Sequence, residues 1–274
     1  MEKLSISSKI LLIFKILLSL LFVSYISLLV FFVFFANKER RFAIGGVPQG
    51  TQFSQFVLST LIGDFPNYSD AFLEKSVPYN KRGLYYEGFK LLNNAVDLNP
   101  KEHLGYRGWM KLNKLKDYQG AIKDFKKLDS LTPDYFDVNG GSINYLLATA
   151  YQGIGNADES MFFYKKLFEE NKNNYPIFPI SYVNYGILLD RKGLHKEAIE
   201  QFNTALEKTD NKLSEAYYNK ALAYKKLGVG DSADFFFNKA LSSYDQGYKI
   251  KDIYNETFNE LYRDDIVYEL SKKK

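Results

Sequence analysis

Residues 179–211 read PISYVNYGILLDRKGLHKEAIEQFNTALEKTDN, and residues 214–247 read SEAYYNKALAYKKLGVGDSADFFFNKALSSYDQG. Shifted by 35 positions, the two stretches match at the places that define the repeat, among them Tyr182 and Tyr217, Asn184 and Asn219, Gly193 and Gly228, Ala198 and Ala233, Phe202 and Phe237, and Ala205 and Ala240. A recurrence of about 34 residues, with small and aromatic residues at fixed places, predicts a repeated helix–turn–helix unit.

Three less regular copies precede this pair, so the five predicted repeats are 69–100, 102–135, 141–172, 179–211 and 214–247. The loop at 134–140 and the Pro-containing stretch at 171–179 interrupt the period. Pro78 falls inside the first helix of the first repeat, where it removes a backbone donor and clashes with the preceding turn. We therefore expect that helix to kink or to end early, near Val77.

These residues resemble the tetratricopeptide repeat (TPR) family. The family pattern has an aromatic, a large, a small and a Tyr-like residue on the first helix, then Ala, an aromatic and Ala on the second. One repeat fills it with Tyr182, Tyr185, Gly186, Leu189, Ala198, Phe202 and Ala205, and the next with Tyr217, Lys220, Ala221, Tyr224, Ala233, Phe237 and Ala240. Departures are Gly88 and Ser160 in place of Ala, and Leu128 and Leu167 in place of the second small residue.

The resemblance covers about residues 69–245 and implies an all-α fold: a right-handed α-solenoid of about five TPR helix–turn–helix repeats. Residues 246–274 continue with an apolar periodicity between Tyr248 and Leu270 but without the repeat pattern. The last repeat of a solenoid exposes an apolar surface that needs a cap. We expect 246–274 to be a C-terminal capping helix and a basic tail.

A different kind of segment lies near the N-terminus. Ile16–Ala36 holds no charged residue and would span roughly 30 Å as a helix, about one bilayer core. We expect residues 1–41 to be a tail and one transmembrane anchor, and 42–68 to be a linker with a short helix at 52–62 that caps the first repeat. A cleaved signal peptide is the alternative, although only Ala36 is small near a cleavage position.

The distribution of charged residues does not determine the orientation of the predicted transmembrane segment, and it argues against nucleic-acid binding. The basic residues divide equally around the span, with Lys3, Lys9 and Lys15 before it and Lys38, Arg40 and Arg41 after it, so either topology stays open. We favour the solenoid on the extracytoplasmic side because the preceding tail is short. From position 42 onward there are 30 basic and 30 acidic residues, whereas a nucleic-acid-binding domain normally has a basic excess.

In the TPR family the first helices line a concave surface. The resemblance sends thirteen residues into this groove: His103, Tyr106, Arg107, Met110, Tyr145, Thr149, Gln152, Asn184, Ile187, Arg191, Tyr218, Asn219 and Leu222. Tyr offers a large contact area at low entropic cost, and Asn can hydrogen-bond an extended backbone. The groove therefore favours a protein or peptide partner, with a merely solvated groove as the alternative.

The sequence offers no chemistry for catalysis. There is no Cys, and the two histidines, His103 and His195, share no motif with each other or with carboxylates. No phosphate loop, zinc-binding helix motif, calcium loop or nucleophile elbow is present. We expect no enzyme activity, no cofactor and no metal, but a membrane-anchored scaffold or adaptor. An accessory subunit or chaperone of an envelope assembly or secretion complex is the alternative, and a divergent enzyme is a third hypothesis.

Overall fold

The structure is a computed structural model that describes residues 6–133, 137–138, 141–170, 177–252 and 255–272. The chain divides into two compact units, Met1–His103 and Leu104–Lys274. Each unit is described by itself.

The first unit is helical and begins with a long apolar helix. Its helices are α1 (Ile6–Phe34), α2 (Lys38–Gly46), α3 (Gln52–Asp64), α4 (Ser69–Lys81) and α5 (Tyr85–Leu98), and α6 (Pro100–Met110) begins in it. The starts of α2 and α3 are capped by side chains: Asn37 accepts the Arg40 N–H at 3.0 Å, and Thr51 accepts the Ser54 N–H at 3.1 Å.

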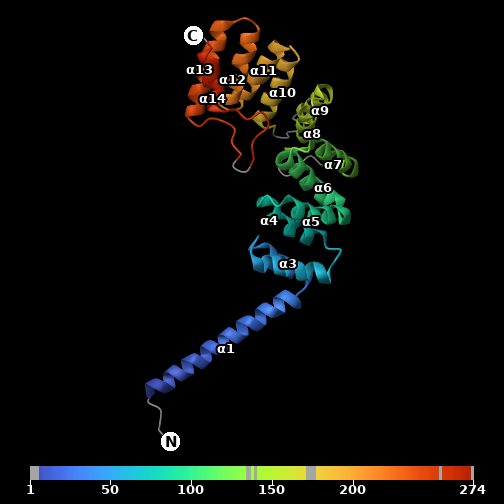
Figure 1. The fold of residues 1–274 in the computed structure, drawn as a ribbon, viewed down its shortest axis with the longest axis vertical. Helices are drawn as coiled ribbons and strands as arrows, with labels where there is room; N and C mark the ends of the chain where they lie inside the picture. Colours follow the sequence, from blue (N-terminus) through green and yellow to red (C-terminus); the bar gives the residue numbers. More distant parts are fainter. Residues whose placement is uncertain (1–5, 134–136, 139–140, 171–176, 253–254, 273–274) are drawn as a thin grey trace. The chain divides into compact units, whose positions relative to one another are not determined.

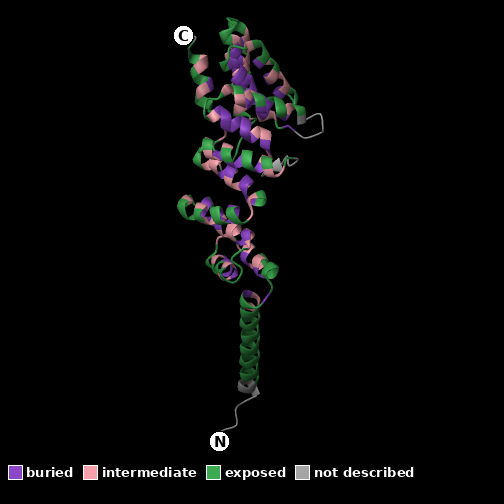
Figure 2. Ribbon diagram, turned by 90° about the vertical axis from the view of Figure 1, so that its right-hand side faces the viewer, coloured by how far each residue is buried: buried purple, intermediate pink, exposed green. Residues whose placement is uncertain are grey.

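Helix α1 differs in its bounds from the predicted span of residues 16–36. Among the described residues it is the helix that is long and apolar enough to cross a membrane, over Ile10–Phe34. Lys15 therefore lies inside the helix instead of before the apolar run. Its side chains are exposed along most of its length (Figure 2), unlike those of a core helix. A signal sequence passes the same test of length and composition.

The second unit holds the regular repeats (Figure 1). After α6 come the π-helix η1 (Lys111–Leu115), α7 (Tyr118–Leu131), the two-residue strands β1 (Asp137–Val138) and β2 (Gly141–Ser142), α8 (Ile143–Gly153) and α9 (Ala157–Glu170). They are followed by α10 (Pro179–Arg191), α11 (His195–Glu207), α12 (Ser214–Lys226), α13 (Gly230–Asp245) and α14 (Arg263–Ser271). The strands pair antiparallel, with Val138 opposite Gly141.

Small residues bring the two helices of each repeat together, as the pattern predicts. A Cβ on Gly186 of α10 would lie 2.5 Å from Phe202 Cε1 of α11, and one on Gly108 of α6 would lie 2.6 Å from Phe125 Cε1 of α7. Both phenylalanines are fully buried. The turn glycines Gly193 and Gly228 have φ values of 82° and 78°, which L side chains rarely adopt. The tight turn between paired helices is therefore built the same way in both copies.

The expected early end of the first helix near Val77 is wrong, because helix α4 continues through Pro78 to Lys81. Pro78 stands in the last turn, so only a few residues follow the missing hydrogen bond and the helix tolerates it. Helix α6 passes into the π-helix η1, which ends at Lys116 with a left-handed φ of 53°. A π-helix has no sequence pattern comparable to the repeat.

The largest difference lies after α13. The predicted cap is helical only in α14, which begins at Arg263. Helix α14 does cover the last repeat, because its Leu270 packs on the cluster of Ala221, Ala233 and Phe237. Residues 248–252 and 255–262, here called the return segment, are not helical; Ile253 and Tyr254 lie outside the described residues.

Local hydrogen bonds explain why the return segment forms no helix. The Asn255 N–H donates to Asp252 Oδ1 at 3.1 Å, and both the N–H and the hydroxyl of Thr257 donate to the Glu260 carboxylate. Such side-chain bonds offer the backbone an alternative to helical pairing. Asn259 adds a left-handed φ of 58°, which Asn tolerates better than most residues.

Candidate functional site

The return segment contacts residues of the repeats that lie far from it in the sequence. Near its start, the Ser214 N–H donates to the Tyr248 carbonyl at 2.9 Å, and the Ile250 N–H donates to Glu215 Oε1 at 2.8 Å. Farther along, Lys116 Nζ donates to the Glu256 carbonyl at 3.3 Å. In Figure 1 the trace that leaves α13 accordingly runs back past α12 and α10 before it enters α14.

Side-chain amides form the centre of this contact. Arg191 donates to Asn259 Oδ1 at 3.4 Å, Asn259 Nδ2 donates to Asn184 Oδ1 at 2.9 Å, and Asn184 Nδ2 donates to the Tyr145 hydroxyl at 3.4 Å. The Asn184 side chain is completely buried. A buried primary amide is costly unless its groups are paired, so Asn259 satisfies an acceptor that the repeats would otherwise leave open.

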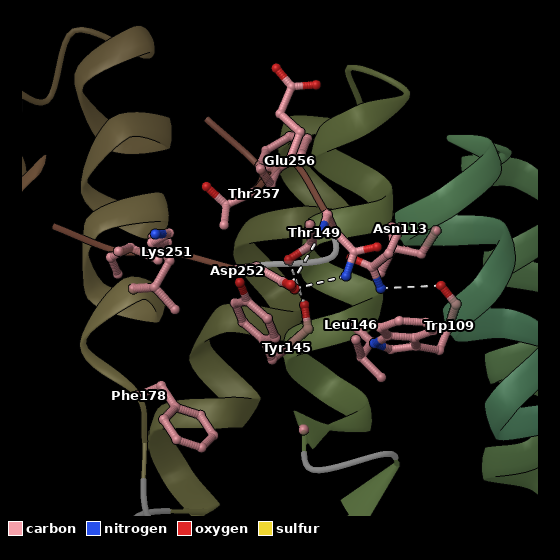
Figure 3. A pocket seen from close by; sticks show the side chains of 16 residues that line it. Trp109, Asn113, Tyr145, Leu146, Thr149, Phe178, Lys251, Asp252, Glu256 and Thr257 are labelled. Carbon is pink, nitrogen blue, oxygen red and sulfur yellow. Dashed lines mark hydrogen bonds between the residues drawn. The ribbon is translucent and has the colours of Figure 1, made fainter. Parts of the chain in front are cut away.

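A cavity of about 580 Å³ lies between the return segment and the first helices of the unit (Figure 3). Its lining includes Trp109, Tyr145, Leu146 and the amide of Asn113 from the repeats, together with Lys251, Asp252, Glu256 and Thr257 of the return segment. The Trp109 ring stacks on Tyr106, with centroids 6.4 Å apart. The space thus combines aromatic surface with a few polar groups, which is typical of binding pockets.

Several predicted groove residues take part in this site. Tyr145 and Thr149 line the cavity, while Asn184 and Arg191 hold Asn259. Others pack locally: Gln152 accepts from the Tyr164 hydroxyl at 3.4 Å, and Ile187 is buried. Their part in binding a partner stays a prediction.

The three predicted positions on α12 diverge. Tyr218 and Leu222 pack against the cluster that α14 also covers. Burial, together with the nearby carboxylates Asp265 and Glu269, raises the pKa of Tyr218 to about 12. Asn219 donates to the Glu215 carbonyl in its own helix at 2.8 Å. Helix α14 therefore takes up much of the surface that the pattern assigns to this part of the groove.

Three predicted groove residues are engaged elsewhere. His103 is buried in the first unit, 3.4 Å from Asp70 Oδ1, and burial lowers its pKa. Met110 is buried in the core. Arg107 binds both oxygens of Asp124 in its own repeat, at 2.8 and 2.9 Å. Because the Asp124 carboxylate is buried, it requires cationic partners, and this need turns Arg107 away from the open groove predicted for it.

Sequence reasoning missed Glu215, Lys116 and the return segment itself. Glu215 is buried, and burial raises the pKa of its carboxyl group to about 7. Its Oε2 has no hydrogen-bond partner among the described residues. Glu215 lies one helical turn before Asn219, which could have placed it on the groove face. An acidic residue in the first turn of a helix is ordinarily explained by its favourable interaction with the helix dipole. For this reason the position of Glu215 does not by itself indicate a role in the groove.

The second histidine joins two repeats. His195 Nδ1 lies 2.6 Å from Asp190 Oδ1, and Lys226 Nζ lies 2.5 Å from Asp190 Oδ2. The three groups connect α10, α11 and α12. Within the described part of the chain, no group of three or more His, Asp or Glu residues is arranged to hold a metal ion.

Paired antiparallel helices that stack through small and aromatic residues define an α-solenoid of helix–turn–helix repeats. The tetratricopeptide repeat family profile matches residues 141–174, 180–207 and 214–246, so the chain contains TPR repeats. It is 29% identical over 188 residues to the TPR repeat-containing protein MJ1428 of Methanocaldococcus jannaschii. That match covers 67% of this chain but only 30% of the relative.

Solved structures with the same fold have low sequence identity to the chain. PilW, described as a widely conserved type IV pilus biogenesis factor, has a TM-score of 0.60 at 14% identity, covering 77% of this chain and 96% of PilW. YrrB, described as a TPR protein with an unusual peptide-binding site, has a TM-score of 0.53 at 16% identity, covering 68% and 91%. MamA from Desulfovibrio magneticus RS-1 has a TM-score of 0.56 at 17% identity, covering 65% and 96%.

Proposed function

We propose that this protein is a non-catalytic scaffold that binds an extended segment of a partner protein along the first helices of its second unit. One observation carries the proposal: non-helical chain already lies against these helices, held by backbone and amide hydrogen bonds. Extended segments are commonly recognised through main-chain hydrogen bonds, with side-chain pockets supplying specificity. The cavity beside Trp109 and Tyr145 offers such a pocket.

We further propose that α1 anchors the scaffold in a membrane, with the repeats on the extracytoplasmic side. The apolar side chains of α1 are exposed to a degree that is costly in water but favourable in lipid. A cleaved signal sequence is the competing account. The mass of the mature chain distinguishes them, because cleavage removes the segment that contains Ile10–Phe34.

The groove proposal is tested by capturing partners from native membranes with the full chain and then measuring the affinity of each purified partner. Tyr145→Ala and Asn184→Ala should weaken binding of a groove partner at least tenfold. Tyr86→Ala is the matched control, because Tyr86 is an 82% exposed tyrosine of the first unit. Equal affinity of all the chains for every captured partner would contradict the proposal.

A second candidate is an accessory subunit that joins an envelope assembly through α1 itself. Its support is the row of exposed apolar side chains on α1, which could pack against other helices in a bilayer. A partner that is still captured by the Tyr145→Ala and Asn184→Ala chains, but is lost when α1 is replaced by an unrelated apolar helix, would favour this candidate.

A further inference from the structure

We infer that residues 255–262 of the return segment are an intramolecular ligand of the groove, and that a partner binds by displacing them with a non-helical segment carrying a primary amide beside an aromatic residue. The inference rests on the groove function proposed above. It adds the chemistry of the partner segment and the requirement that this segment compete with residues 255–262 for the groove.

The amide requirement follows from the hydrogen bonds of Asn259. Its oxygen accepts from Arg191 while its nitrogen donates to Asn184 Oδ1. A primary amide carries its acceptor and its donor on two separate atoms of one group, as these two bonds require, whereas a hydroxyl offers both functions from a single oxygen. A carboxylate cannot donate to Asn184, and an ammonium group cannot accept from Arg191. The groove therefore selects Asn or Gln at this place in a bound segment.

The aromatic requirement comes from the neighbouring residue. The Phe258 ring meets Tyr118 edge to face, with centroids 6.4 Å apart and planes at 88°. Phe258 also lines the cavity that Trp109 and Tyr145 border. An aromatic side chain in a competing segment can occupy the same place. Lys116, by contrast, binds the backbone carbonyl of Glu256 and so places no demand on that side chain.

Contacts on either side tether residues 255–262. Before them, Tyr248 and Ile250 are bound to α12. After them, Arg263 forms two hydrogen bonds with Asp245 of α13, at 2.7 and 3.0 Å, and Glu269 pairs with Lys225 of α12. Tethering keeps residues 255–262 at a high effective concentration, of millimolar order. A free peptide of the same sequence should therefore bind poorly until the tethered copy is weakened.

The segment between these tethers can leave without breaking the repeats. The bonds that shape residues 255–262 are largely local: Thr257 to Glu260, and the Tyr262 hydroxyl to Glu256 at 2.8 Å. The adjoining cavity of about 580 Å³ provides room for the side chains of a competitor. Release of the segment breaks the hydrogen bonds of the Asn259 amide and the Glu256 carbonyl, separates the Phe258 ring from Tyr118 and exposes the buried Leu261 side chain.

The test uses the full chain in detergent and a fluorescent peptide of sequence NETFNELY, which corresponds to residues 255–262. Binding is measured by anisotropy. Asn259→Gly is the informative substitution, because glycine readily adopts the φ of 58° while the side chain that carries the amide is removed. Combined with Phe258→Ala, it should free the groove and tighten binding of the added peptide about tenfold or more, since apparent affinity scales with the fraction of open chains.

The matched control is Asn238→Ala, whose amide donates to Asp234 within α13 and touches no part of the groove. This chain should bind the peptide as weakly as the wild type. Adding Asn184→Ala to the Phe258→Ala, Asn259→Gly chain should abolish the gain, and Arg191→Ala, at an exposed position, should reduce it without a change in the melting temperature. Equal binding by the wild-type and the double-variant chain, or binding by neither, would overturn the inference.

Failure of the inference can be told apart from failure of the groove proposal. A captured partner that loses affinity on Asn184→Ala but is indifferent to the double variant would overturn the internal ligand and leave the groove intact. A partner indifferent to both would contradict the groove. If both proposals hold, the double variant should bind the partner more tightly than the wild type does.

Discussion

The side-chain amide of Asn259 donates to the buried side-chain oxygen of Asn184 at 2.9 Å, although 75 positions of sequence separate the two residues. This hydrogen bond joins the return segment to the first helix of a repeat at a position that the TPR pattern assigns to the groove. It is the best indication in the molecule of what the groove can recognise.

Glu215 should make the stability of the second unit depend on pH. Burial, assisted by Glu260 and opposed by backbone hydrogen bonds and by Lys249, raises its pKa from 4.5 to about 7. The folded state then binds more protons at Glu215 than the unfolded state does between these values, so the stability that Glu215 contributes is fully present below about pH 4.5 and is lost as pH rises to about 7. The loss is at most about 3 kcal/mol. Glu215→Gln should flatten this part of the urea-unfolding profile measured at pH 5 and pH 8; an unchanged slope would show that Glu215 is not the source.

Loss of the Asp124 carboxylate should be strongly destabilising. It pairs with Arg107 and with Lys111, whose Nζ lies 2.7 Å from Oδ2, and all three side chains are mostly buried. Asp124→Asn leaves two cations without their counter-charge, which typically costs about 3–5 kcal/mol. Thermal unfolding followed by circular dichroism measures it. Asp129→Asn on the same helix is the control and should change the melting temperature little.

Gly186→Ala should separate α10 from α11. The new methyl group would lie 2.5 Å from the Phe202 ring, so the helices must move apart or the ring must rotate, at a cost of roughly 1–3 kcal/mol. Gly230→Ala is the matched control, since a Cβ there meets no atom within 4 Å. Adding Phe202→Leu to the Gly186→Ala chain should recover part of the loss. Equal melting temperatures for the two alanine chains would contradict the close packing.

The anchor makes a separate prediction. If α1 stays in the mature protein and spans a bilayer, the chain should remain with membranes after alkaline carbonate extraction, and its mass should include residues 10–34. A reporter fused after Lys274 should be active only on the extracytoplasmic side. Release by carbonate, or a mature mass that lacks this segment, would favour a signal sequence.

The repeats could be predicted because their determinants are local and recur. Gly186 and Phe202 are 16 positions apart and reappear, with Ala221 for Gly186, in the next copy. Each such pair specifies how two adjacent helices pack. The profile matches to residues 141–174, 180–207 and 214–246 and the similar solved structures confirm this fold.

The return segment could not be predicted in the same way. Its apolar residues, including Ile250, Phe258 and Leu261, recur with a spacing that suits one face of a helix. The segment is instead non-helical and forms single long-range hydrogen bonds with Asn184, Glu215 and Lys116. Isolated bonds of this kind produce no repeating pattern in the sequence. The ion pair between Arg107 and Asp124 could not be predicted for a similar reason. The repeat pattern places Arg107 in the groove, but the buried Asp124 carboxylate needs a cationic partner.

The groove account is tested most directly by the dissociation constant of the NETFNELY peptide for the full chain with and without the Phe258→Ala, Asn259→Gly pair. The account predicts about tenfold or tighter binding to the double variant, and loss of that gain when Asn184→Ala is added. The same dissociation constant for the wild-type and double-variant chains would contradict it.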